Sequence, residues 1–148
     1  MNRIVLALFA GAGAALAIGV LAYSQTEIPH AVLLMAPFGA TTVLVFGIPD
    51  SPLAQTKNVI FGHLITAFIG IFFSQLIGVS PFTLAMASGL AVSAMLLTKT
   101  THPPAGANPI LIMLSGQSWG FLLTPVLIGA VVIVVLGKCM QRLQRRLA

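Results

Sequence analysis

The polar side chains that could bind a ligand in this chain gather at two Pro-x-Gly-Ala segments. Thr41 and Thr42 directly follow the segment 37–40, and Asn108 directly follows the segment 104–107. Proline is tolerated in the first turn of a helix, so each segment predicts the start of a short helix with free N–H groups. Such groups, with hydroxyl and amide donors beside them, suit a small anion. Alternatively, proline and glycine merely kink packed helices.

Two histidines and a basic position extend this predicted site. His102 could donate to an anion, carry a coupled proton, or only shape the turn that follows it. His63 lies in an apolar run, where it could serve the site or bond a neighbouring carbonyl as a neutral ring. Lys57 and Asn58 could attract anions to an entrance or simply flank a membrane. The predicted substrate-binding residues are Pro37, Gly39, Ala40, Thr41, Thr42, His63, His102, Pro104, Gly106, Ala107 and Asn108.

The other reactive side chains do not combine into a catalytic or metal-binding set. The carboxylates of Glu27 and Asp50 are predicted on opposite sides of a membrane, and Cys139 is the single cysteine. Because His, Asp and Glu are not clustered, a metal cage is not expected. There is no Walker loop, so direct use of ATP is not expected either. We therefore expect a protein that is not an enzyme and has no cofactor.

The composition indicates the solvent around the elements that position these residues. The chain has 148 residues, of which 6% are charged and 58% hydrophobic, and its mean hydropathy is +1.07. A soluble domain carries about 25% charged residues, so we expect one integral membrane domain over residues 1–148. The net charge of +5 does not indicate nucleic-acid binding, because four of the seven Lys and Arg lie after residue 137. That clustering is typical of a cytoplasmic membrane flank and could also contact anionic lipid.

Apolar runs predict six membrane crossings. They cover residues 4–23, 31–48, 59–78, 82–98, 105–114 and 121–137. With six crossings, all seven Lys and Arg fall on one side of the membrane, which the positive-inside rule makes cytoplasmic. We therefore expect both termini in the cytoplasm and a location in the inner (plasma) membrane of a bacterium.

The two halves of the chain repeat at an offset of 67 residues. Pro37, Gly39 and Ala40 recur as Pro104, Gly106 and Ala107, and further identities follow. Repeat 1 covers about 4–78, repeat 2 about 82–137, and a basic cytoplasmic tail covers 138–148. Each half has three spans, an odd number, so the second half must be inverted, as is common in secondary transporters. The predicted fold is therefore an all-α membrane protein of two inverted three-span repeats with broken middle helices.

Three separated motifs resemble the HPP family of integral membrane proteins. They are the runs 101–109 (THPPAGANP), 36–41 (APFGAT) and 51–64, which includes SPLAQ, KNVI and GHL. Members of this family are small multi-span membrane proteins, and plant chloroplast and cyanobacterial members are linked to nitrite transport. The resemblance implies transport of nitrite or a similar small anion.

The transport hypothesis has alternatives. The chain could be a passive channel for a small anion or a neutral solute, or a non-transporting membrane scaffold subunit. A polar cavity between Gly39 and Gly106 would favour transport, whereas a dry, packed crossing would oppose it. Six short spans are few for a complete pathway, so we expect a homo-oligomer, a dimer or trimer. Small residues recur at every fourth position as Gly11, Ala15, Gly19 and as Ala85, Gly89, Ser93, which favours internal packing or an oligomer contact.

Overall fold

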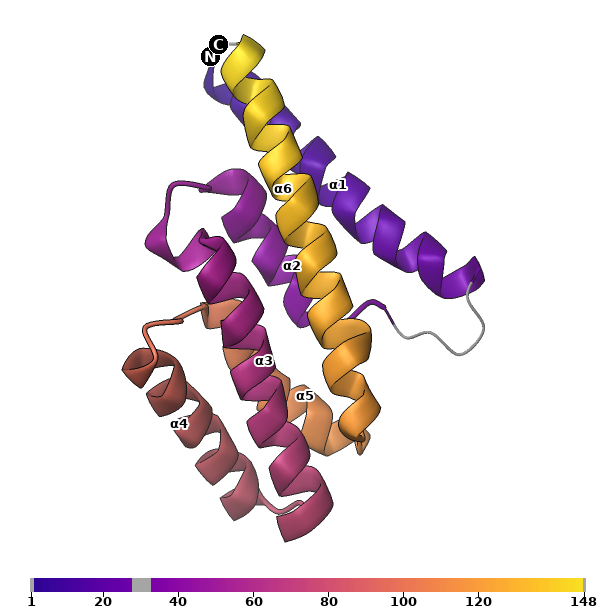
Figure 1. The fold of residues 1–148 in the computed structure, drawn as a ribbon, viewed down its shortest axis with the longest axis vertical. Coiled ribbons are helices and arrows are strands. Elements are labelled where there is room, and N and C mark those ends of the chain that lie inside the picture. The colour runs from indigo at the N-terminus through magenta and orange to yellow at the C-terminus, as the bar shows by residue number, and fades with distance from the viewer. Residues whose placement is uncertain (1, 28–32, 148) are drawn as a thin grey trace.

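The computed structural model describes residues 2–27 and 33–147, which form helices joined by short connections (Figure 1). The first half contains α1 (Arg3–Glu27), α2 (Pro37–Thr42) extended by the π-helical turn η1 (Val43–Gly47), the turn η2 (Pro52–Ala54), and α3 (Thr56–Phe72) extended by η3 (Phe73–Ile77). The second half contains α4 (Pro81–Leu97), the turn η4 (Pro103–Ala107) leading into α5 (Asn108–Ser115), and the turns η5 (Trp119–Leu122) and η6 (Leu123–Leu127) leading into α6 (Ile128–Leu147).

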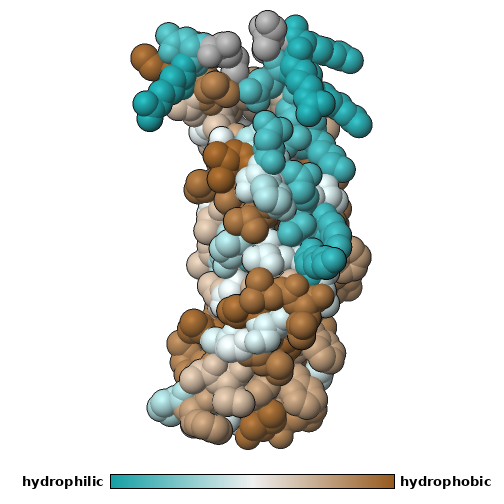
Figure 2. All heavy atoms as spheres, turned by 90° about the vertical axis from the view of Figure 1, so that its left-hand side faces the viewer, coloured by the Kyte–Doolittle hydropathy of each residue, from teal (hydrophilic) through white to brown (hydrophobic). Residues whose placement is uncertain are grey.

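The surface of the helices is suited to lipid. The helical stretches Arg3–Glu27, Thr56–Ile77 and Trp119–Arg146 are long and apolar enough to cross a membrane. Large apolar side chains point outward, with Leu97 at 84% and Phe82 at 73% exposure. Much of the lower part of the molecule in Figure 2 is correspondingly hydrophobic, whereas hydrophilic residues gather towards its upper end. Such a surface is stable against lipid tails and unfavourable in water, so the chain is a helical integral membrane protein.

Local sequence determines where several helices begin and end. The Ser80 hydroxyl accepts the Thr83 N–H at 3.1 Å, and the Thr83 hydroxyl accepts the Ser80 N–H at 2.8 Å. This reciprocal cap, followed by Pro81, starts α4. Gly116 ends α5 at φ 64°, a left-handed conformation that favours glycine.

The helices lie where hydropathy predicts apolar segments, with two differences. The predicted second run began at residue 31, which lies outside the described residues, and the described segment 33–36 is not helical before α2 begins at Pro37. The predicted basic tail 138–148 is helical as far as Leu147, because α6 continues through it. Lys, Arg, Gln and Leu are good helix formers, so the helix continues after its apolar part ends.

The third helix of each half packs against the middle helix of the other half. α3 contacts α5, and α6 contacts α2 and η1. A Cβ placed on Gly62 would lie 2.9 Å from the Thr100 carbonyl oxygen, and one on Gly129 would lie 3.2 Å from the Leu33 carbonyl oxygen. Gly129 lies 67 residues after Gly62, and Thr100 lies 67 residues after Leu33. This is the offset of the sequence repeat. Glycine at these positions allows a close approach of backbone that a larger residue would prevent.

The prediction that the small-residue stripes pack inside the protein is wrong. Gly11, Ala15 and Gly19 of α1 and Ala85, Gly89 and Ser93 of α4 are exposed. The buried positions are instead Gly13, Ala17 and Leu21 of α1 and Ala87, Ala91 and Met95 of α4. Helices that are apolar on every face do not show by hydropathy which face is packed.

Candidate functional site

Four of the predicted site residues meet at the centre of the molecule. Thr41 of α2, His63 of α3, His102 just before η4 and Asn108 of α5 are all fully buried. They come from both halves of the chain, and α2 contacts η4 directly. We call Thr41, His63, His102 and Asn108 the central cluster. Such polar side chains deep in an apolar helical protein require partners of their own.

The Thr41 hydroxyl is the hub of the central cluster. Its Oγ1 lies 2.8 Å from His63 Nε2 and 3.0 Å from His102 Nε2. It also lies 3.1 Å from the Pro37 carbonyl oxygen, one helical turn earlier in α2. The two imidazole rings meet edge to face, with their centroids 5.0 Å apart. The Phe38 and His63 rings also meet edge to face, with their centroids 5.3 Å apart. One hydroxyl therefore joins both histidines, and the Phe38 ring packs against His63.

Asn108 and Leu53 hold the outer ends of the cluster. Asn108 Nδ2 lies 3.1 Å from His63 Nδ1 and donates to the His63 carbonyl at 3.1 Å and to the Thr66 hydroxyl at 2.9 Å. His102 Nδ1 lies 2.8 Å from the Leu53 carbonyl oxygen in η2. Asn108 Oδ1 is buried without a hydrogen-bond partner among the described residues. The cluster thus connects the loop at η2 to the first turn of α5.

Thr66 belongs to this arrangement and is absent from the predicted site. It is fully buried and donates to the carbonyl oxygens of Gly62 and His63, at 2.9 and 3.2 Å. Its place three residues after His63 puts both side chains on one face of a helix, which is a sequence feature that could have identified it. Leu53 contributes its backbone carbonyl oxygen to the site. The identity of its side chain gives no indication of this role in the sequence.

The remaining predicted residues divide between buried and exposed positions. Pro37, Thr42 and Pro104 are buried, Gly106 is half-buried, and Gly39, Ala40 and Ala107 are exposed. Thr42 donates its hydroxyl hydrogen to the Gly39 carbonyl at 2.7 Å. The prediction of free N–H groups at the first break is wrong for Gly39. Its N–H is donated to the Ala36 carbonyl oxygen at 3.1 Å. The turn before Pro37 already supplies that acceptor.

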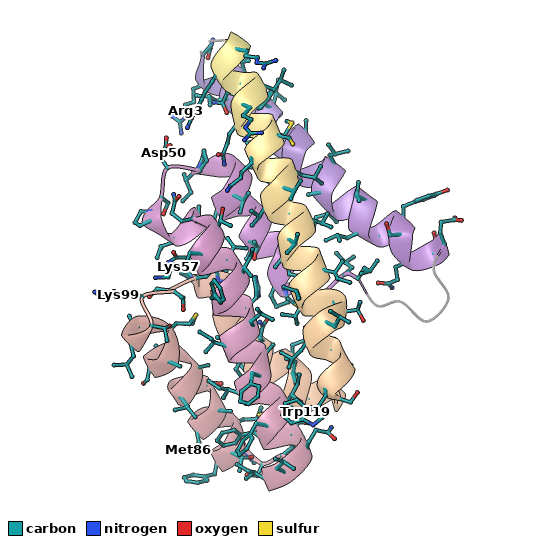
Figure 3. The ribbon with its side chains drawn as sticks, viewed as in Figure 1. Arg3, Asp50, Lys57, Met86, Lys99 and Trp119 are labelled. Atoms are coloured by element: carbon teal, nitrogen blue, oxygen red, sulfur yellow. The ribbon has the colours of Figure 1, made fainter. Side chains whose placement is uncertain are left out.

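The predicted entrance residues lie beside the cluster. Lys57 is exposed, and its side chain points outward at the left edge of Figure 3, close to Lys99. Asn58 is half-buried and donates from Nδ2 to the Thr101 carbonyl at 2.9 Å. That bond fastens α3 to the backbone just before His102.

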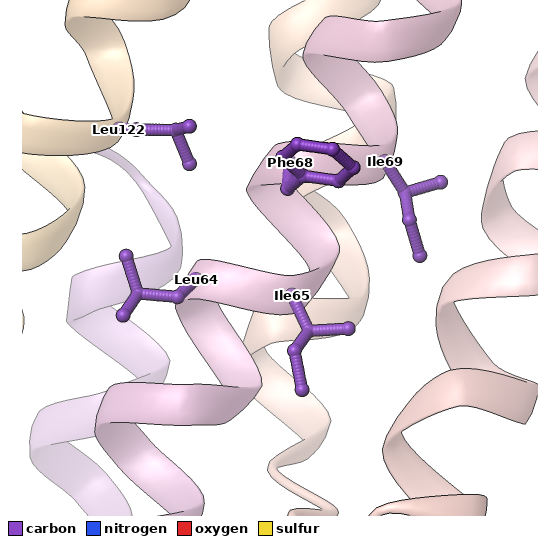
Figure 4. Close-up of a pocket in the computed structure, with 5 residues that line it drawn as sticks. All are labelled: Leu64, Ile65, Phe68, Ile69 and Leu122. Atoms are coloured by element: carbon purple, nitrogen blue, oxygen red, sulfur yellow. The ribbon is translucent and has the colours of Figure 1, made fainter.

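The larger cavities lie away from the central cluster. An open apolar groove of about 320 Å³ is lined by Leu64, Ile65, Phe68, Ile69 and Leu122 (Figure 4). A second groove of about 390 Å³ reaches Gly39 and is lined also by Ile18, Leu34, Met35 and Ala36. Neither groove is lined by the central cluster. The crossing of the two halves is therefore closely packed here, but its centre is polar.

The described residues hold no group of three or more His, Cys, Asp or Glu side chains that could bind a metal ion. The two histidines of the central cluster are joined by hydroxyl and amide groups. The chemistry that this arrangement supports is hydrogen bonding and proton binding.

Comparison with known proteins gives the family. The family described as HPP, transmembrane region, matches residues 1–148. Two transmembrane proteins of Dictyostelium discoideum are similar, one 33% identical over 139 residues (88% of this chain, 45% of the relative) and one 32% identical over 122 residues (77% and 43%). The chain thus spans less than half the length of these relatives. No solved structure matches. The chain belongs to the HPP family of transmembrane proteins.

Proposed function

We propose that this protein transports nitrite or a similar small monovalent anion across the membrane. The observation that carries the proposal is the central cluster, in which buried polar side chains from both halves meet at the start of two short helices. Ionisable residues inside a membrane protein are costly and generally serve substrate or ion pathways. The resemblance of the surrounding motifs to nitrite-linked members of the family supports the choice of anion.

The proposed architecture is two inverted three-span repeats with both termini in the cytoplasm of a bacterium. Reciprocal contacts support the repeat, because Gly70 approaches Ile112 and Gly137 approaches Val45. Gly137 lies 67 residues after Gly70, and Ile112 lies 67 residues after Val45. Charge supports the orientation. Arg3 lies near the top of Figure 3, Lys57 and Lys99 lie on its left side at about mid-height, and Trp119 lies at the lower right. Trp is frequent at membrane interfaces, and Lys and Arg are frequent on the cytoplasmic side.

The packed cluster corresponds to a closed conformation in this proposal. The polar hydrogen atoms of Thr41, His63 and Asn108 are donated to neighbouring groups of the protein, so an anion can be bound only when the two halves separate. Separation would release the Thr41 hydroxyl, an imidazole N–H and the Asn108 amide N–H as donors for an oxyanion. Movement of one repeat against the other is the usual way in which inverted repeats expose such a site.

A non-transporting scaffold is the second candidate, and the close packing of the crossing favours it. Hydrogen bonds across two halves would then serve only to hold them together. A passive channel would instead need an open polar path beside the cluster. As with the transporter, we propose a dimer or trimer for either case.

Nitrite flux into proteoliposomes tests the proposal. The wild-type protein should take up nitrite above empty liposomes, and Thr41→Ala or Asn108→Ala should reduce uptake at least about tenfold, the equivalent of 1.4 kcal/mol. Ser115→Ala is the matched control, because Ser115 is exposed and bonds only within its own helix and to Gln117. Wild-type uptake equal to that of empty liposomes would contradict the transport proposal and favour the non-transporting scaffold.

A further inference from the structure

The hydrogen bonds of the central cluster have a direction that can be worked out from His102. Its Nδ1 lies 2.8 Å from the Leu53 carbonyl oxygen, which can only accept a hydrogen bond. His102 Nδ1 therefore carries the hydrogen. In the neutral ring, Nε2 then has a free lone pair, and this lone pair faces the Thr41 hydroxyl. His102 enters the cluster as an acceptor.

The opposite end has the opposite polarity. In the structure the Asn108 NH2 group faces the His63 carbonyl and the Thr66 hydroxyl and donates to both. The same NH2 group lies 3.1 Å from His63 Nδ1. A ring N–H at Nδ1 would face the amide hydrogens, so we assign the lone pair of His63 to Nδ1. His63 then carries its hydrogen on Nε2 and donates it to the Thr41 hydroxyl oxygen. The two histidines are thus opposite tautomers.

Thr41 has one hydroxyl hydrogen and two acceptors within reach. His102 Nε2 lies 3.0 Å and the Pro37 carbonyl oxygen 3.1 Å from Thr41 Oγ1. Rotation about one bond moves the hydrogen from one acceptor to the other. In both positions the oxygen can still accept from His63, since a hydroxyl has two lone pairs. The hydroxyl is a two-position switch beside an imidazole lone pair.

We propose that His102 Nε2 is the proton-binding atom of this protein and that the Thr41 hydroxyl is its switch. A hydronium ion on the side to which the site opens gives up one O–H bond and leaves as water, and one N–H bond forms at His102 Nε2, so that His102 becomes an imidazolium. The Thr41 hydrogen turns to the Pro37 carbonyl, and Thr41 Oγ1 then accepts from both rings. No other bond is broken. His63 and Asn108 act as positioning residues, because they orient the hydroxyl without binding this proton.

The surroundings of His102 indicate what accompanies the proton. A buried imidazolium needs a negative partner. His102 lies against Thr41 of α2, Gly62 and His63 of α3, and Leu53 of η2. The two acidic side chains of the chain, Glu27 and Asp50, are both exposed. His63 is the titratable neighbour, and the nearby Lys57 and Lys99 are exposed and point outward (Figure 3). A transported anion would supply the missing charge.

The inference therefore rests on the proposed function and gives it a stoichiometry. One proton on His102 binds together with one monovalent anion, so the loaded site carries no added net charge. Transport is then an electroneutral symport. Uptake should follow the pH gradient and be insensitive to the membrane potential.

Nitrogen NMR tests the proton site without any transport. The chain has three histidines, so His30→Gln leaves two to observe, and His102→Gln assigns them. In lipid at alkaline pH, His102 should be the Nδ1–H tautomer and His63 the Nε2–H tautomer. As the pH falls from about 8 to 5 with nitrite present, His102 should gain a second N–H. An Nε2–H tautomer of His102 at alkaline pH, or no protonation over this range, overturns the proposal.

Proteoliposome uptake tests the coupling. An inward proton gradient of one pH unit should accumulate nitrite up to about tenfold, with no effect of an imposed potential. His102→Gln should abolish the accumulation and make any remaining flux respond to the potential, because nitrite then moves with its charge. Thr41→Val should have the same effect, whereas Thr41→Ser should keep the accumulation. Wild-type flux that ignores the pH gradient overturns the inference, whereas absence of any wild-type flux overturns the proposed function itself.

Discussion

At the scale of single residues, the central cluster shows how one amide organises a buried polar site. Asn108 supplies hydrogen bonds to His63 and Thr66 and thereby selects the tautomer of His63. Its own Oδ1 has no partner among the described residues. A buried acceptor without a partner is uncommon and costly, and functional sites are among the places where it occurs. Asn108 is therefore placed to gain a hydrogen bond from a ligand or water when the site opens.

Asn108→Ala should destabilise the protein by about 1–3 kcal/mol, because it leaves the His63 carbonyl and the Thr66 hydroxyl oxygen without their donor. Thermal unfolding in detergent should show a lower midpoint. Ser115→Ala, which removes an exposed hydroxyl in the same helix, should change stability by less than about 0.5 kcal/mol. Equal unfolding midpoints for the two variants would show that the hydrogen bonds of Asn108 make no net contribution to the stability of the protein.

At the scale of helices, close contacts through glycine align the polar side chains. Gly62 immediately precedes His63, and a Cβ at Gly62 would lie 2.9 Å from both the Thr100 carbonyl oxygen and His102 Cβ. The same contact that brings α3 against the segment before η4 therefore brings His63 and His102 together. The distance between the two rings depends on a residue that has no polar atom in its side chain.

Gly62→Ala should cost about 1–3 kcal/mol through overpacking, because backbone atoms and His102 Cβ cannot easily move away. Nitrite uptake should fall as well, since His102 would be displaced from Thr41. Gly19→Ala is the matched control. It adds the same methyl group within α1, where nothing lies within 4 Å, and should be neutral or stabilising by up to about 1 kcal/mol. If both variants unfold at the same temperature, the close packing at Gly62 is refuted.

At the scale of the whole molecule, apolar surface and charge are segregated. Apolar side chains cover the flanks, including the groove of Leu64 and Phe68 shown in Figure 4, while Arg3, Lys57 and Lys99 lie at one edge. Lipid tails favour the first kind of surface, and headgroups and water favour the second. This segregation supports the proposed orientation.

Cysteine labelling tests that orientation. Cys139 is exposed, so it is first replaced, as in Cys139→Ser. Single cysteines at Lys57→Cys and Lys99→Cys should then resist a membrane-impermeant thiol reagent added outside intact cells. Gln117→Cys and Val79→Cys should react with it. Labelling of the lysine positions alone would contradict the proposed orientation, and labelling of all four positions would contradict the six crossings.

Much of the fold and part of the site could be predicted from local sequence. Proline and glycine mark helix ends wherever they occur, so the starts of α2 and η4 followed from Pro37 and from the Pro103-Pro104 pair. His63 and His102 were conspicuous because polar residues are rare in this chain. Thr66 was missed, because a threonine in an apolar helix more often bonds only its own backbone.

Sequence by itself determined that this protein lies in a membrane and where most of its apolar helices are, because hydropathy and backbone preference act over a few neighbouring residues. Tertiary structure alone decided which side chains meet. It paired the Thr41 hydroxyl with two histidines, directed His102 to the Leu53 carbonyl and packed α1 through Gly13 instead of the neighbouring stripe. The physical reason is that hydrogen-bond partners depend on the rotation of each helix about its axis. In a helix that is apolar all round, only contact with its neighbours determines that rotation.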